Sequence, residues 1–96
     1  MSIYESTLQR IIQDLNDRIS EIEEQLEDIN IDVELCQNLM DYIKGGSFEI
    51  NNVLVVDSRV VDSLTNKIDR LNKKRDTLEQ LKKEWVLQRI EFSSET

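Results

Sequence analysis

Apolar residues recur at steps of three and four along the first half of the chain, and this spacing constrains the fold more than any other feature. The residues that carry it are Tyr4, Leu8, Ile11, Leu15, Ile19, Ile22, Leu26, Ile29, Val33, Cys36, Met40 and Ile43. Such steps build one apolar seam along a helix, whereas a half-buried strand requires strict alternation. The spacing therefore predicts one long helix over residues 3–44, which Gly45 and Gly46 end.

A second apolar series predicts a second helix over residues 58–92. Its members are Val61, Leu64, Ile68, Leu71, Leu78, Leu81, Trp85, Val86, Ile90 and Phe92. Between Leu71 and Leu78 the segment NKKRDT contains no apolar residue, so the seam is expected to be weak there. After this helix the short polar tail of residues 93–96 is expected to fray.

The distribution of charge indicates how the two helices pair. The net charge is −8, yet residues 1–44 hold eleven acidic and three basic residues, whereas residues 45–96 hold nine of each. An antiparallel hairpin would bring Lys82 and Lys83 near Glu21, which favours this arrangement through opposite charge. We therefore predict a mainly α fold in a single domain, residues 1–96: a long antiparallel helical (coiled-coil) hairpin.

Residues 47–56, at the bend, carry a strand pattern instead of a simple helical turn. The runs SFEI and VLVV are rich in β-formers, and Asn51-Asn52 between them tolerates the positive φ of a two-residue turn. This turn predicts a β-hairpin in which Ile50 pairs with Val53 and Glu49 pairs with Leu54.

A lone two-stranded hairpin is marginal in water, so other copies of the chain are expected to cover it. The last turns of the first helix add apolar residues outside the main seam, beginning with Ile31. The predicted oligomerisation residues are Leu35, Leu39, Tyr42, Phe48, Ile50, Val53, Leu54 and Val55. Alternatively, the hairpin folds back onto its own helices and caps a monomer.

This plan resembles the β-type subunits of the prefoldin family, which have a long helix, one β-hairpin and a long antiparallel helix. The stretch FEINNVLVV is similar to the hairpin of that family, although Asn51-Asn52 stands where glycines are usual. The resemblance implies hairpins that assemble into a β-barrel platform, from which helical coils project. It also implies that the free ends of those coils hold non-native proteins.

The two chain ends are predicted to lie together at the far end of the hairpin and to be rich in apolar residues. Residues expected to contact a client or partner are Tyr4, Leu8, Trp85 and Phe92. Two interpretations stay open: these side chains close the end of the helical pair, or they form an apolar tip that grips exposed hydrophobic segments.

Composition argues against several classes of function. The chain has no histidine, and Cys36 falls on the helical seam, where a small core residue is expected instead of a nucleophile. The acidic cluster of residues 21–28 lies on a straight helix, which splays its carboxylates apart. We expect no catalytic residue, no cofactor and no metal. A strongly acidic chain is also not expected to bind nucleic acid or a membrane, and a cytoplasmic location is expected.

These features predict a non-enzymatic, self-assembling coiled-coil protein that acts as a prefoldin-like holdase or assembly scaffold for other proteins. One alternative is a small acidic inhibitor or adaptor that docks on one specific protein, for example by imitating nucleic acid. Another alternative is a structural coiled-coil subunit of a larger complex.

Overall fold

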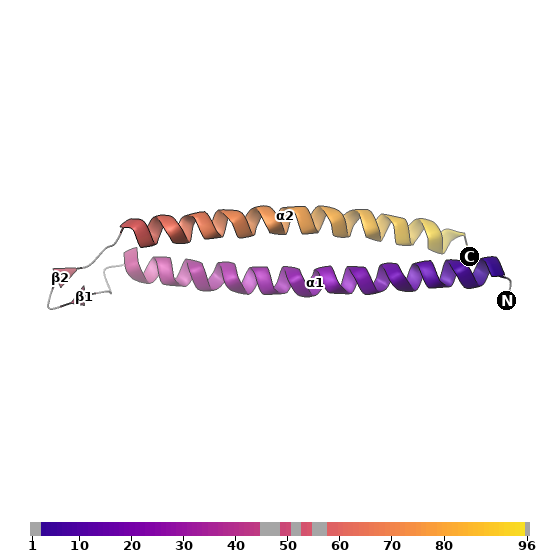
Figure 1. Ribbon diagram of the computed structural model, residues 1–96, viewed down its shortest axis with the longest axis horizontal. Helices are drawn as coiled ribbons and strands as arrows, with labels where there is room; N and C mark the ends of the chain where they lie inside the picture. Colours follow the sequence, from indigo (N-terminus) through magenta and orange to yellow (C-terminus); the bar gives the residue numbers. More distant parts are fainter. Residues whose placement is uncertain (1–2, 45–48, 51–52, 55–57, 96) are drawn as a thin grey trace. The chain divides into compact units, whose positions relative to one another are not determined.

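The protein is a pair of long helices joined by a bend that contains two very short strands (Figure 1). The computed structural model describes residues 3–44, 49–50, 53–54 and 58–95. In chain order the elements are α1 (Ile3–Lys44), β1 (Glu49–Ile50), β2 (Val53–Leu54) and α2 (Ser58–Ser94). Helix α1 has the predicted bounds, and α2 runs two residues further than predicted.

The two helices pack against each other in two compact units. One unit joins Met1–Glu27 to Asp76–Thr96, and the other is Asp28–Arg75. In the first unit the order of partners along the helices is antiparallel, because Asn16 bonds to Arg89 and Glu23 pairs with Lys82. In the second unit, Thr65 Oγ1 lies 3.4 Å from Met40 Sδ across the two helices.

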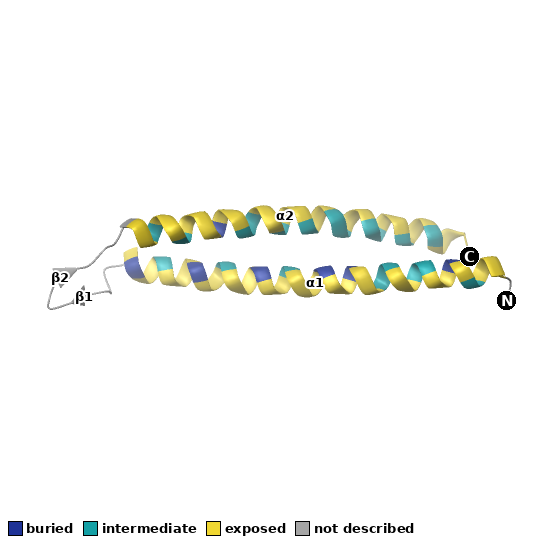
Figure 2. Cartoon of the chain, in the orientation of Figure 1, coloured by how far each residue is buried: buried dark blue, intermediate teal, exposed yellow. Residues whose placement is uncertain are grey.

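Helix α1 supplies most of the core. Among the described residues the buried ones are Leu8, Ile19, Ile22, Ile29, Cys36, Ile43 and Ile68, and only the last belongs to α2. Every one of them belongs to a predicted apolar series. Figure 2 shows the buried and half-buried residues of each helix on the side that faces the other helix. The core is therefore a single narrow seam, as the spacing predicts.

Helix α2 continues to Ser94, two residues beyond its predicted end, and Glu95 follows in a turn. Ser94 Oγ donates to the Glu91 carbonyl at 2.7 Å, and the Glu95 amide donates to the Phe92 carbonyl at 3.2 Å. The Tyr4 hydroxyl also donates to Glu95 Oε2 at 3.0 Å. The first two of these bonds satisfy carbonyl groups that a helix end leaves unpaired, which is consistent with the continuation of α2 to Ser94.

The described part of the bend is one pair of two-residue strands. β1 pairs antiparallel with β2, with Glu49 opposite Leu54 and Ile50 opposite Val53. These are two of the residue pairs that the two-residue turn predicts. The rest of the predicted hairpin over residues 47–56 lies outside the described residues and stays a prediction.

The polar gap on α2 between Leu71 and Leu78 is occupied by half-buried polar residues, Asn72 and Arg75. Asn72 Oδ1 is buried without a hydrogen-bond partner among the described residues. On α2, the boundary between the two compact units falls within this polar gap, after Arg75. The seam is thus polar where the sequence predicts it to be weak.

Replacing Asn72 with leucine is expected to stabilise the protein. The change removes a buried acceptor and continues the apolar seam, so the free energy of unfolding should rise by about 1–2 kcal/mol. Urea denaturation followed by circular dichroism measures this difference. Asn66→Leu is the matched control, because Asn66 is exposed on the same helix and its replacement should change stability little. A less stable Asn72→Leu variant would show that the amide has a bonding role in the seam.

Candidate functional site

Four large apolar side chains of α1 form an exposed row, which we call the α1 stripe: Ile31, Leu35, Leu39 and Tyr42. Their exposed fractions are 48%, 61%, 49% and 51%. Steps of four, four and three place them on one side of a helix. On a different side of the same helix, Ile29, Cys36 and Ile43 are buried in the core. The structure therefore places the predicted residues Leu35, Leu39 and Tyr42 together on the surface of the second compact unit.

Acidic residues edge the α1 stripe. Asp28, Asp32, Glu34 and Asp41 lie within the same turns and are all exposed. None of these four carboxylates forms an ion pair with any residue that the structure describes. The stripe is thus an apolar surface within a negative field, and a partner that neutralises this field would be favoured.

The other predicted oligomerisation residues belong to the bend. Phe48 and Val55 lie outside the described residues. For Ile50, Val53 and Leu54 only the backbone pairing of β1 with β2 is described. The role predicted for these five residues therefore stays a prediction.

The predicted client-contact residues divide between core and surface. Leu8 is buried at 3% exposure, which assigns it to closure of the helical pair. Tyr4 is exposed, whereas Trp85 and Phe92 are half-buried. The neighbouring Ile3 is the most exposed of the large apolar residues, at 88%. Among the described apolar residues toward this end, Ile3, Tyr4, Leu87 and Ile90 are exposed, and sequence spacing alone did not separate Ile3 and Tyr4 from Leu8.

The hydroxyl of Tyr4 is held in its protonated form. Its hydrogen bond to Glu95, and then the negative charge of that carboxylate, raise the pKa of Tyr4 above its ordinary value. The bond links the first turn of α1 to Glu95, the residue that follows the end of α2.

Trp85 has a charged neighbour that the apolar pattern did not reveal. The guanidinium carbon of Arg18 lies 5.6 Å from the centre of the Trp85 ring, a cation–π geometry. Arg18 Nε also donates to Asp14 Oδ2 at 3.1 Å, one turn earlier on α1. Trp85 therefore takes part in holding α1 to α2 in the first unit, and its side chain is half-buried.

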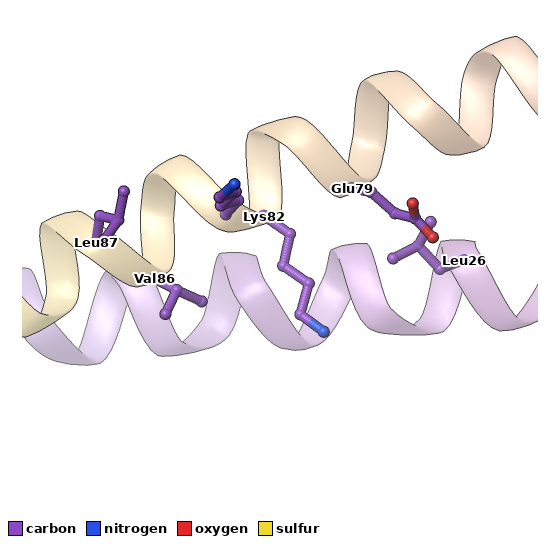
Figure 3. A pocket seen from close by; sticks show the side chains of 6 residues that line it. Leu26, Glu79, Lys82, Val86 and Leu87 are labelled. Carbon is purple, nitrogen blue, oxygen red and sulfur yellow. The ribbon is translucent and has the colours of Figure 1, made fainter.

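A groove with lysines along its edge lies in the first compact unit (Figure 3). We call it the lysine-edged groove, and its volume is about 400 Å³. Its lining residues are Leu26 of α1 and Glu79, Lys82, Lys83, Val86 and Leu87 of α2. In Figure 3, Val86 points toward α1 and Leu87 points away from it. Sequence reasoning missed this groove, because its lining comes from both helices and depends on their register.

The two lysines of the groove differ in their partners. Lys82 Nζ lies 3.4 Å from Glu23 Oε1, although the sequence predicted Glu21 as the acid opposite. Lys83 is exposed and forms no ion pair with any described residue. The groove therefore combines three aliphatic side chains with two lysines and one carboxylate, Glu79, and Lys83 and Glu79 form no ion pair with a described residue.

Among the described residues, no group of three His, Cys, Asp or Glu side chains is placed to hold a metal ion. Cys36 is a free, buried cysteine, as expected of a small seam residue. Neither α1 nor α2, as far as they are described, has an apolar stretch long enough to cross a membrane.

Comparison of the chain with protein-family models, curated proteins and solved structures found no match.

Proposed function

We propose that this protein is a non-enzymatic, self-assembling helical hairpin that binds other proteins, as a prefoldin-like holdase or assembly scaffold. The observation that carries the proposal is the α1 stripe. Four large apolar side chains, each about half exposed, follow one another on one face of a helix. Contiguous apolar surface of this kind marks sites of protein interaction.

Burial of the stripe would contribute favourable free energy to association. Full burial of a large apolar side chain contributes about 1.5–3 kcal/mol, and the side chains of the stripe are half exposed in the free chain. Each can therefore contribute about half of that amount on assembly, before the cost of association. Several such contacts, repeated over more than two copies, produce avidity without any single strong contact.

The bend supplies a second assembly element in this proposal. Its residues Phe48, Ile50, Val53, Leu54 and Val55 would add an apolar hairpin face next to the stripe in the sequence. Exposed edges of a two-stranded hairpin favour pairing with another copy. Support for this element comes from the sequence pattern and from the backbone pairing of β1 with β2.

Native mass spectrometry across a hundredfold range of concentration tests the self-assembly. A closed oligomer of constant size, or a mass that grows with concentration, is the expected result. A monomer at every concentration would refute self-assembly and would leave the stripe as a docking surface for a different chain.

Holding of non-native proteins is expected to depend on the exposed chain ends. Replacing both Ile3 and Tyr4 with serine removes the apolar surface there, so suppression of client aggregation should fall several-fold. Light scattering of a heat-denatured test protein measures this suppression. The matched control is Val60→Ser, since Val60 is also exposed, at 41%, but belongs to the other compact unit. Equal losses in both variants would indicate a general effect of surface polarity instead of a client-holding end.

A second candidate function is a small acidic adaptor that docks on one basic protein. The observation that favours it is the set of carboxylates along the stripe that lack described ion pairs. Such binding would weaken steeply as salt is raised, because exposed charges are screened over roughly 10 Å at 0.1 M salt. A holdase that relies on apolar contact would retain its clients under the same salt.

A further inference from the structure

We infer that the α1 stripe of one molecule docks in the lysine-edged groove of a second molecule, so that copies associate head to tail. This inference rests on the proposed self-assembly and names the two surfaces that meet. One surface belongs to the second compact unit of one copy, and the other belongs to the first compact unit of its neighbour.

The groove combines an apolar lining with basic residues, whereas the stripe is bordered by carboxylates. Its apolar lining consists of Leu26, Val86 and Leu87, and Leu87 is 59% exposed although it is a large aliphatic residue. At the edge, Lys83 forms no ion pair with a described residue, and the two lysines of the lining outnumber its one carboxylate, Glu79. An apolar row bordered by carboxylates fits such a site, since apolar surface meets apolar surface and the charges at the rim are opposite.

Pairing of two stripes is disfavoured by the same charges. Asp28, Asp32, Glu34 and Asp41 border each stripe, so a symmetric contact would bring eight carboxylates to one interface. Like charges that face each other across an interface cost free energy and select against that partner. A neighbour with lysines at its edge removes this cost.

The other hollows of the described surface fit the stripe less well. One is lined by Asp76, Thr77, Gln80, Leu81 and Glu84, and its two carboxylates would repel an acid-edged stripe. A second is lined by Arg59, Asp62, Ser63, Asn66 and Arg70, with no large aliphatic side chain. A third is lined by Lys67, Arg70, Leu71 and Lys74, in which one half-buried leucine is the only large aliphatic group. The lysine-edged groove alone among these four combines basic residues with several aliphatic ones.

The contact is heterologous, because the two surfaces that meet are different. Each molecule then carries one free stripe and one free groove, and addition continues until the ring closes or a filament grows. This geometry makes a prediction that a symmetric contact does not share: two different variants, each with one damaged surface, can still form one intact contact with each other.

The experiment uses one variant for each surface. The stripe variant is Leu35→Asp/Leu39→Asp, and the groove variant is Lys83→Glu/Leu87→Asp. All four residues are exposed, so both chains should keep their helical circular dichroism signal. The matched control for the groove variant is Ile90→Asp, which is 58% exposed and lies three residues from Leu87 but does not line the groove.

Native mass spectrometry is applied to each variant alone and to an equimolar mixture. We expect each variant alone to be monomeric, with an apparent Kd at least about a hundredfold weaker than that of the unmodified chain. The mixture should form a one-to-one heterodimer and nothing larger, because a single intact stripe and a single intact groove remain between the two chains. The Ile90→Asp control should assemble as the unmodified chain does.

Other results would overturn the inference in distinguishable ways. If the groove variant assembles normally and the mixture forms no heterodimer, stripes pair with stripes, and self-assembly survives without the groove. If both variants assemble normally, the assembly uses a different surface, such as the bend. If the unmodified chain is a monomer throughout, the proposed self-assembly and this inference both fail.

Discussion

Substituting aspartate for Leu39 should raise the apparent dissociation constant of the assembly by roughly a hundredfold. Leu39 lies within the α1 stripe and is 49% exposed in the free chain. The substitution removes apolar contact and adds a fifth negative charge beside Asp28, Asp32, Glu34 and Asp41. A loss of about 2.7 kcal/mol of binding free energy corresponds to that hundredfold change. Sedimentation velocity at several concentrations measures it.

The folded monomer should tolerate this substitution. Because the Leu39 side chain lies half in solvent, its replacement should change the free energy of unfolding by only about 0.5 kcal/mol. Asn38→Asp serves as the control, since it adds the same charge at the adjacent exposed position and leaves the stripe intact. Assembly of the Leu39→Asp variant at the same concentrations as the unmodified chain would exclude the stripe as an interface.

The helices could be predicted well from the sequence because their determinants are local. Steps of three and four along residues 3–44 define one seam, and Gly45 follows the last helical residue, Lys44. Every buried residue among those described falls on a predicted seam position. The end of α2 was predicted less well, since Ser94 and Glu95 extend it by hydrogen bonds that apolar spacing does not report.

The α1 stripe could be predicted from the sequence, whereas the lysine-edged groove could not. The α1 stripe lies on one helix, so its spacing alone predicted that Leu35, Leu39 and Tyr42 share a face outside the core. The lysine-edged groove joins Leu26 to residues 79–87, and it appears only when the register of the helices is known. A register error of two residues, Glu21 in place of Glu23 opposite Lys82, was enough to hide it.

The contact of Arg18 with Trp85 illustrates the same limit at the scale of one residue. The sequence placed Trp85 on the apolar seam, where it is half-buried. Its ring also faces the guanidinium of Arg18, on the opposite helix. An arginine beside a seam stacks on an aromatic ring only if the two lie at the same level, which depends on the exact register. The apolar pattern thus predicted the burial of Trp85 but not its contact with Arg18.

Replacing Ile22 with aspartate is expected to destabilise the first compact unit strongly. Ile22 is 3% exposed and lies on the narrow seam, in which no described side chain is less than 2% exposed. A buried carboxylate without a partner, together with the lost apolar contact, should cost about 4–5 kcal/mol. A domain of this size has a total stability of about 5–15 kcal/mol, so the substitution removes a large part of it.

Thermal denaturation followed by circular dichroism at two pH values measures this effect and its cause. Burial raises the pKa of an introduced carboxyl group, so the Ile22→Asp variant should regain stability as the pH falls toward 4 and the group is protonated. Gln25→Asp is the matched control, because Gln25 is exposed one turn further along the same helix and should lose little stability. Ile22→Val should lie between them, with a loss of about 0.5–1.5 kcal/mol. Equal midpoints for Ile22→Asp and Gln25→Asp would mean that Ile22 is not held in the seam, and that the helical pair is stabilised elsewhere along its length.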